Sequence, residues 1–300
     1  MFRSHGKEKL GDKPDMAKGS FFFNPLNDCP GTEEERNLYP ASYPCNRWPE
    51  KDMIPGFESA AKQLGRLMKD VVVLLTRRID SYSLKHCNNT SKQSYPTNLL
   101  YDMMKDTEKV KGRLLYYYPL PETSSASTED SWIGWHNDSG FVTALAGDMY
   151  VDDETGQQID CPDPKAGLYV ENNSGRAVHV TIPPDCMAVQ FGECLQVLTG
   201  GSLVGTPHCV RGIDPALGTR VARISFPCFV DSVPAFPLNM PQGYTRDDIL
   251  KAGGSNSKVP PLGQRWTHNG MTFGEFLQKS VEVYYSWTVN QGGLEEEKSS

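Results

Sequence analysis

Apolar residues recur at helical spacing in the first third of the chain. Between residues 56 and 83 they follow one another at steps of three and four, which places them on one face of a helix. These residues are Phe57, Ala60, Leu64, Leu67, Val71, Leu75, Ile79 and Tyr82. The run VVVLL widens this face, so the pattern predicts a well-buried helix. A second helix is expected to begin near Thr97, with Leu99, Leu100 and Met103 on one side.

From residue 113 onward the apolar residues form short runs, each bounded by Gly, Pro, Asp or Asn, which is typical of strands. The runs are RLLYYYP, FVTALAG, GLYVEN, RAVHVTIPP, CMAVQFGE, LQVLTGGSL and ARISFPCFVD. Strands this short and this frequent favour a jelly roll or a barrel. We therefore expect a mainly β fold with flanking helices. The segment TFGEFLQKSVEVYY predicts a final helix, followed by a frayed end in QGGLEEEKSS.

The pattern divides the chain into three parts. Residues 1–112 form an N-terminal irregular and helical region, in which prolines recur every few residues over 1–55. Residues 113–235 form the jelly-roll core. Residues 236–300 form a C-terminal extension, whose helix is expected to pack on the core.

Composition narrows the class of protein. The 300 residues are enough for one large domain or two small ones, and such a chain needs no disulfides for stability. Its eight cysteines include no CxxC pair, which favours reduced thiols and a cytoplasmic location. The net charge of -7 and the lack of a long basic run argue against a nucleic-acid partner. No apolar run is long enough to span a bilayer, so we expect no membrane partner. We also expect the protein to be a monomer.

A histidine and an aspartate lie two positions apart in GWHNDSG. In a strand, His136 and Asp138 point to the same face and can reach one ion. Of the other histidines, His208 in GTPHCVRG follows a predicted strand pair, and 70 residues separate it from Asp138. A His-x-Asp pair with a distant histidine is the ligand set of non-haem Fe(II) oxygenases, which leaves open positions for a chelating co-substrate and O2.

An arginine and a serine on one later strand face fit the co-substrate of such a site. Arg223 and Ser225 lie two positions apart in VARISFP, after His208. A dicarboxylate such as 2-oxoglutarate leaves one carboxylate pointing away from the metal. A guanidinium and a hydroxyl group on the same face suit that planar anion.

These motifs resemble the iron- and 2-oxoglutarate-dependent dioxygenase superfamily, in the branch shared by isopenicillin N synthase and the plant dioxygenases. The resemblance covers residues 113–230. GWHNDSGFVTAL is similar to the strand with the His-x-Asp pair, TPHCV to the distal histidine and RIS to the Arg-x-Ser pair. Members of the family usually have a strand-rich stretch before the segment SHG, which Met1 nearly abuts here. We therefore expect the chain to lack part of its N-terminal region.

The resemblance implies a double-stranded β-helix, a cupin-like jelly roll, and an oxidoreductase that uses Fe(II), 2-oxoglutarate and O2 on a small organic substrate. His136, Asp138 and His208 are expected to hold iron, and Arg223 and Ser225 to hold 2-oxoglutarate. Tyr118, in YYYP, falls where the family has a tyrosine that binds the co-substrate. The resemblance also places Phe229 and Tyr116 near the substrate.

The sequence is also compatible with three other functions. One is a non-catalytic jelly roll that keeps a metal ion as a sensor or scaffold. A second is an oxidase that does not use 2-oxoglutarate, as in isopenicillin N synthase. A third is a hydrolase with zinc or another divalent ion on a cupin-like barrel, against which Arg223 and Ser225 argue, because a hydrolase needs no dicarboxylate anchor.

Overall fold

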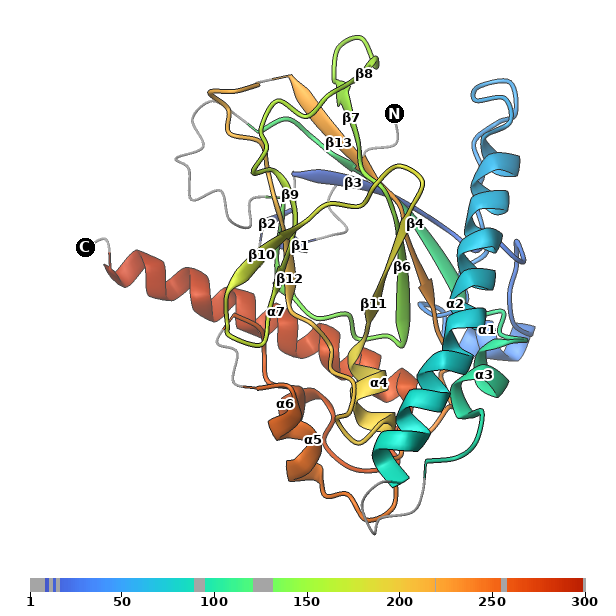
Figure 1. Ribbon diagram of the computed structural model, residues 1–300. Helices are drawn as coiled ribbons and strands as arrows, with labels where there is room; N and C mark the ends of the chain where they lie inside the picture. Colours follow the sequence, from blue (N-terminus) through green and yellow to red (C-terminus); the bar gives the residue numbers. More distant parts are fainter. Residues whose placement is uncertain are drawn as a thin grey trace.

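Two antiparallel sheets form the centre of the protein. The computed structural model describes residues 9–10, 13–14, 17–88, 95–120, 132–218, 220–254 and 258–298. The smaller sheet has the strand order β10-β9-β12-β5 and the larger one the order β11-β6-β14-β4-β13-β7-β8, with β3 added on β4. Figure 1 shows the two sheets opposite each other, as in a jelly roll. The predicted fold class is confirmed.

The strands of the smaller sheet are β5 (Ile133–His136), β9 (Gly167–Glu171), β10 (Ala177–Val180) and β12 (His208–Arg211). Those of the larger sheet are β3 (Lys18–Phe23), β4 (Val110–Tyr117), β6 (Val142–Ala146), β7 (Met149–Asp152), β8 (Gln158–Ile159), β11 (Met187–Phe191), β13 (Val221–Ser225) and β14 (Pro227–Val230). A separate hairpin joins β1 (Lys9–Leu10) and β2 (Lys13–Pro14).

The helices are α1 (Glu33–Leu38), α2 (Phe57–Asn88), α3 (Leu99–Met104), α4 (Glu193–Leu198), α5 (Arg246–Ala252), α6 (Leu262–Arg265) and α7 (Phe273–Lys298). The predicted helices at 56–83, near Thr97 and at 272–285 are confirmed. The last continues through most of the segment expected to fray. No helix in the described ranges has the length and apolar character to cross a membrane.

The helix α2 is confirmed, but only part of its predicted apolar face is buried. Leu67 and Val71, which belong to that face, are exposed. Ile79 of the predicted face and Val72 of the VVVLL run are buried, together with Met68, because this side of α2 packs against β6 and β14. Apolar residues on both sides of a helix leave the choice of buried face to the tertiary packing.

The predicted strand in LQVLTGGSL is also wrong. Its first half belongs to α4, whose six residues are all buried. A short, mostly apolar run has no periodicity that separates a buried helix from a buried strand. Gly200 and Gly201 follow the helix with positive φ angles of 62° and 82°, which glycine adopts readily.

The region expected to be irregular contributes a strand to the core. β3 pairs with β4 along its whole length, from Lys18 opposite Tyr117 to Phe23 opposite Gly112. A Cβ at Gly112 would lie within 2.8 Å of the Phe23 ring, so the close packing here requires glycine. The large sheet therefore combines strands from both sides of residue 113. The segment SHG, on which the expected N-terminal gap rests, lies outside the described residues.

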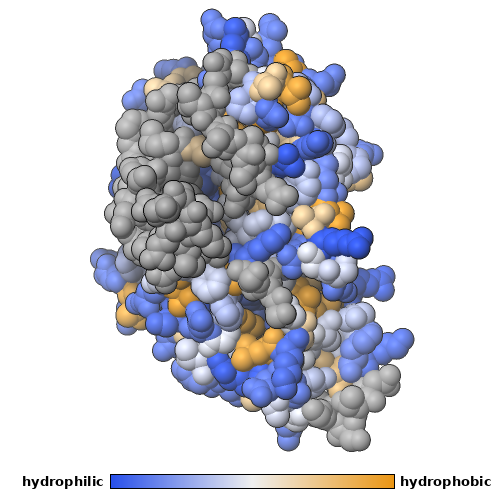
Figure 2. All heavy atoms as spheres, turned by 90° about the vertical axis from the view of Figure 1, so that its left-hand side faces the viewer, coloured by the Kyte–Doolittle hydropathy of each residue, from blue (hydrophilic) through white to orange (hydrophobic). Residues whose placement is uncertain are grey.

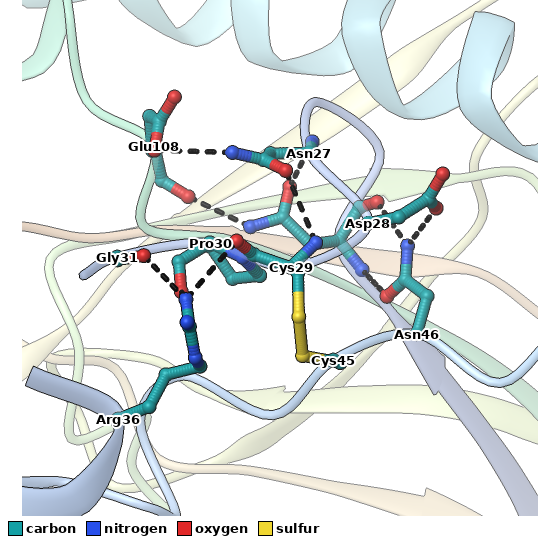
Figure 3. The surroundings of a disulfide bond; sticks show 10 residues. Asn27, Asp28, Cys29, Pro30, Gly31, Arg36, Cys45, Asn46 and Glu108 are labelled. Carbon is teal, nitrogen blue, oxygen red and sulfur yellow. Dashed lines mark hydrogen bonds between the residues drawn. A yellow bond between two sulfur atoms is a disulfide. The ribbon is translucent and has the colours of Figure 1, made fainter. Parts of the chain in front are cut away.

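A disulfide bond joins Cys29 and Cys45, contrary to the expected reduced thiols (Figure 3). The loop that it closes contains α1, and the neighbouring polar side chains hold its ends. Asn46 Nδ2 donates to the Asp28 carboxylate over 2.8 Å, and Arg36 donates to a backbone carbonyl inside the loop. Spacing alone did not reveal this pair, because the two cysteines stand in no recognisable motif.

Hydrophobic side chains on the surface form separate patches. Figure 2 shows one face, on which orange patches alternate with hydrophilic side chains wherever atoms are not grey. Scattered apolar residues of this kind are normal on a protein surface.

We expect that replacing both Cys29 and Cys45 by serine lowers the free energy of unfolding by about 3 kcal/mol, because a cross-link over 16 residues restricts the unfolded chain. Urea denaturation measures the change. Cys186→Ser, at an exposed free cysteine, is the matched control. An unchanged stability of the double variant would show that the bond does not form in solution.

Candidate metal and co-substrate site

The three predicted metal ligands meet where two strands of the smaller sheet pair. His136 ends β5 and His208 begins β12, and the two residues are direct partners in this antiparallel ladder. Asp138 follows β5 by two residues. The candidate ligand atoms of the three residues lie within 4.8 Å of one another, and His208 Nε2 is 3.9 Å from Asp138 Oδ1. Two imidazoles and one carboxylate on one side of a cavity are the donor set of non-haem Fe(II) sites.

Backbone carbonyls fix the orientation of both imidazoles. His136 Nδ1 donates to the Gly134 carbonyl over 2.8 Å, and His208 Nδ1 donates to the Thr206 carbonyl over 3.0 Å. Because Nδ1 carries the hydrogen in both rings, Nε2 keeps its lone pair for a metal ion.

The carboxylate is oriented in a similar way. Thr143, on β6 of the opposite sheet, donates its hydroxyl hydrogen to Asp138 Oδ2 over 2.6 Å. This hydrogen bond holds Oδ2 and turns Oδ1 toward His208. Burial and, to a smaller extent, the adjacent His208 lower the pKa of His136 to about 3. The neutral ring that results is the form that binds a metal ion.

Arg223 reaches the same cavity from the larger sheet. It is 3% exposed and lies on β13, between Tyr117 of β4 and Tyr150 of β7. Its Nη2 donates to Asp148 Oδ1 over 2.6 Å, and its Cζ lies 4.8 Å from the Tyr117 ring centre. Burial opposes the charge, but Asp148 and the two tyrosines raise the pKa of Arg223, which stays protonated.

Two donor atoms of this guanidinium are unused. Arg223 Nε and Nη1 are buried and have no hydrogen-bond partner among the described residues. An unsatisfied buried N–H group is costly, so such atoms indicate a missing acceptor. Ser225, two residues along the strand and also buried, lines the same cavity. The predicted metal ligands and the predicted Arg-x-Ser pair are therefore brought together in one cavity.

The structure does not bring Tyr118 or Tyr116 to this cavity. Side chains alternate along β4, and the pairing with β13 turns Tyr117 toward Arg223. Tyr116 points to the other face, where its hydroxyl donates to Asp153 Oδ1 over 2.6 Å. The Tyr118 hydroxyl lies against Gly19, at a position that a Cβ there would approach to 2.8 Å. Tyr117 is thus the cavity tyrosine that the sequence analysis missed.

Phe229 does line the cavity, together with apolar residues from both sheets. These apolar residues include Ile133, Leu145, Leu168 and Val210. Such a wall keeps water from the metal position and strengthens the electrostatic interactions inside.

A buried polar network holds the turn between His136 and Asp138 from behind. The intervening Asn137 donates its Nδ2 hydrogen to Glu193 Oε1 over 2.9 Å, and its backbone N–H donates to the Tyr284 hydroxyl. Glu193 in turn forms an ion pair with Arg265, and both side chains are almost fully buried. Nothing in the sequence pattern had indicated this network, because its residues come from distant segments.

Comparison with known proteins supports the class of this site. No protein-family model matches the sequence. A 2-oxoglutarate-dependent dioxygenase from Gibberella zeae is 26% identical over 214 residues, which are 68% of this chain and 47% of that protein. The 2-oxoglutarate-dependent dioxygenase htyE from Aspergillus rugulosus is 29% identical over 55% of this chain and 43% of its own length. The chain spans about half the length of the curated relatives that it matches.

Solved structures show the same fold. A crystal structure from Caulobacter crescentus, assigned to the 2OG-Fe(II) oxygenase family, aligns with a TM-score of 0.59 at 20% identity, over 94% of this chain and 73% of that one. A full-length Neurospora crassa protein, crystallised in complex with alpha-KG, aligns with a TM-score of 0.55 at 18% identity, over 89% of this chain and 66% of that one. These findings confirm the resemblance to the iron- and 2-oxoglutarate-dependent dioxygenase superfamily.

We expect Arg265→Met to lower the free energy of unfolding by about 3–5 kcal/mol, because it leaves the buried Glu193 carboxylate without its counter-charge. Urea denaturation measures the loss. Arg220→Met is the matched control, because this exposed arginine pairs with Asp152 and Glu154 at the surface and should change stability by less than about 1 kcal/mol. Equal stabilities of the two variants would contradict a structural role for the buried pair.

Proposed function

We propose that the protein is an Fe(II)- and 2-oxoglutarate-dependent dioxygenase that hydroxylates or desaturates a small organic substrate, with succinate and CO2 as co-products. One observation carries this proposal: Arg223, which has two buried donors without a partner among the described residues, lines the same cavity as the His136–Asp138–His208 cluster. A metal site alone would fit several reactions. A metal site facing a buried cation with free donors fits a co-substrate that is both a chelator and an anion.

The residues present suit both bound groups. His136, Asp138 and His208 would hold the metal ion through Nε2, Oδ1 and Nε2. Fe(II) bound there supplies the activation of O2 that is coupled to the decarboxylation of 2-oxoglutarate. Arg223 would bind the far carboxylate of 2-oxoglutarate through Nε or Nη1, with the Ser225 hydroxyl as a further donor.

Asp148 and Tyr117 would keep the arginine in place. The Asp148 carboxylate holds Nη2, and the Tyr117 ring packs against the guanidinium, so the remaining donors have a fixed direction. A fixed donor loses little conformational entropy on binding, which favours affinity. The cytoplasmic location and the monomeric state remain predictions.

Asp138→Ala should remove most of the Fe(II) binding, because it deletes the anionic ligand while Thr143 loses only one hydrogen bond. Equilibrium dialysis under anaerobic conditions measures the iron bound per chain. Asp153→Ala, at the carboxylate bound by Tyr116 on the other face of β4, is the control. One iron per chain in Asp138→Ala, at unchanged affinity, would refute the assigned ligand set.

Arg223→Leu should weaken 2-oxoglutarate binding by about 30-fold to a few thousand-fold, since removal of one partner of a buried charge pair costs about 2–5 kcal/mol. Arg223→Lys should lie between, because it keeps the charge and loses the planar donors. Arg220→Leu, exposed and three residues earlier, is the control. The measurement is titration of 2-oxoglutarate into the anaerobic Fe(II) protein, followed by charge-transfer absorption.

The same titration separates the alternatives. Fe(II) binding without any effect of 2-oxoglutarate would indicate an oxidase that does not use it. Binding of both without consumption of O2 or formation of succinate would indicate a sensor or scaffold. Equal 2-oxoglutarate affinities of wild type and Arg223→Leu would refute the proposed anchor.

A further inference from the structure

A second pocket adjoins the metal cavity. It has a volume of about 610 Å³, which suits a small organic ligand. Asp138 and Phe229 line both the pocket and the cavity, so the two spaces meet at a metal ligand. If the chain is the proposed dioxygenase, this pocket is the place from which a substrate reaches the metal.

Cationic side chains on β4 and directly before it line both the metal cavity and the second pocket. Arg113 on β4 lines the metal cavity, and Lys111 and Lys109 line the second pocket. Arg113 and Lys111 are two positions apart and share one face of β4, and Lys109 directly precedes this strand. The accumulation is notable in a chain with a net charge of -7.

The ammonium of Lys111 forms no ion pair within the described part of the chain. Among the described residues no carboxylate lies within ion-pair distance of its ammonium, which stands 5.5 Å from the Phe229 ring centre and 5.8 Å from that of Phe22. Lys111 is exposed at the pocket, and partial loss of water around its ammonium lowers the pKa of Lys111. Asp231, the acidic group that most strongly opposes this lowering of the pKa, accepts the Phe141 N–H through Oδ1.

Lys109 lines the pocket wall, and its positive charge is only partly compensated by the protein. Its ammonium donates to the Ser42 carbonyl and lies 5.1 Å from the Tyr43 ring centre. Burial lowers the pKa of Lys109 to about 8, although Asp231 opposes this shift. The wall segment 38–42 lies in the loop closed by the Cys29–Cys45 bond, so this part of the pocket is anchored.

The rest of the pocket is partly apolar. Leu38 of α1 and Val281 of α7 line it, although they are 66% and 72% exposed, and Leu277 lines it beside them. Apolar side chains at an open wall favour an occupant with an apolar part. The occupant that fits therefore combines a hydrocarbon or aromatic portion with one negative charge.

We propose that the substrate is an amphipathic carboxylic acid, whose carboxylate binds the ammonium of Lys111 with help from Lys109 and whose apolar part packs on Phe229. A single charge fits better than a phosphate dianion, because three carboxylates, those of Asp138, Asp231 and Glu282, also line the pocket and repel further negative charge. The inference rests on the proposed function, since it treats the pocket as the substrate site.

The test compares matched acids and amides on the intact protein. The probes are 3-phenylpropanoate, hexanoate and their primary amides, and ligand-observed saturation-transfer NMR gives the dissociation constants. The protein is loaded with Fe(II) and saturated with 2-oxoglutarate under anaerobic conditions, so that Arg223 is already occupied. We expect the acids to bind at least about tenfold more tightly than the amides.

Three variants test whether Lys111 causes the preference for acids over amides. Lys111→Gln should abolish the preference for the acids, Lys111→Arg should retain most of it, and Lys105→Gln should leave it unchanged, because Lys105 is paired with Asp102 on α3. Thermal melting checks that each variant is folded. No acid preference in either pair, or an equal preference in Lys111→Gln, would overturn the inference.

The proposed function is checked separately in the same samples. Charge-transfer absorption of bound 2-oxoglutarate should be the same in wild type and Lys111→Gln, because Lys111 does not line the cavity of Arg223. If 2-oxoglutarate fails to bind to the wild type, the proposed function fails whatever the acids do. If 2-oxoglutarate binds and the acid preference is missing, only the substrate class is wrong.

Discussion

The antiparallel pairing of β5 with β12 is the constraint on which the site depends. It sets His136 directly opposite His208, and the chain beyond β5 then brings Asp138 to the same place. The buried network of Asn137, Glu193 and Arg265 holds this turn from behind. A shift of one residue in the pairing would send one imidazole to the other face of the sheet and leave too few ligands for a metal ion.

The larger sheet supplies the cationic side chains that are proposed to bind an anion. One face of β4 presents Tyr117 to Arg223, Arg113 to the metal cavity and Lys111 to the second pocket. In the proposed function, a single strand thereby contributes to the co-substrate anchor, the metal cavity and the substrate pocket. Because metal ligands and anchor come from different sheets, their distance is set by the packing of the two sheets and by the contact of Thr143 with Asp138.

The sequence predicts the cluster of His136, Asp138 and His208 because residue type, spacing and strand phase agree for the three residues. The tyrosine is harder to choose, because three tyrosines follow one another and only the pairing of β4 with β13 selects Tyr117 over Tyr118. The helix α4, the buried face of α2 and the disulfide bond depend on contacts between distant segments. A pattern read along the chain contains no information about such contacts.

The most direct test is an anaerobic crystal structure of the protein with Fe(II) and 2-oxoglutarate. The account predicts one metal ion bound by His136, Asp138 and His208, with the keto acid end of 2-oxoglutarate on the metal and its far carboxylate within hydrogen-bond distance of Arg223 Nε or Nη1. A metal ion held by other residues, or a 2-oxoglutarate carboxylate away from Arg223, would contradict the account.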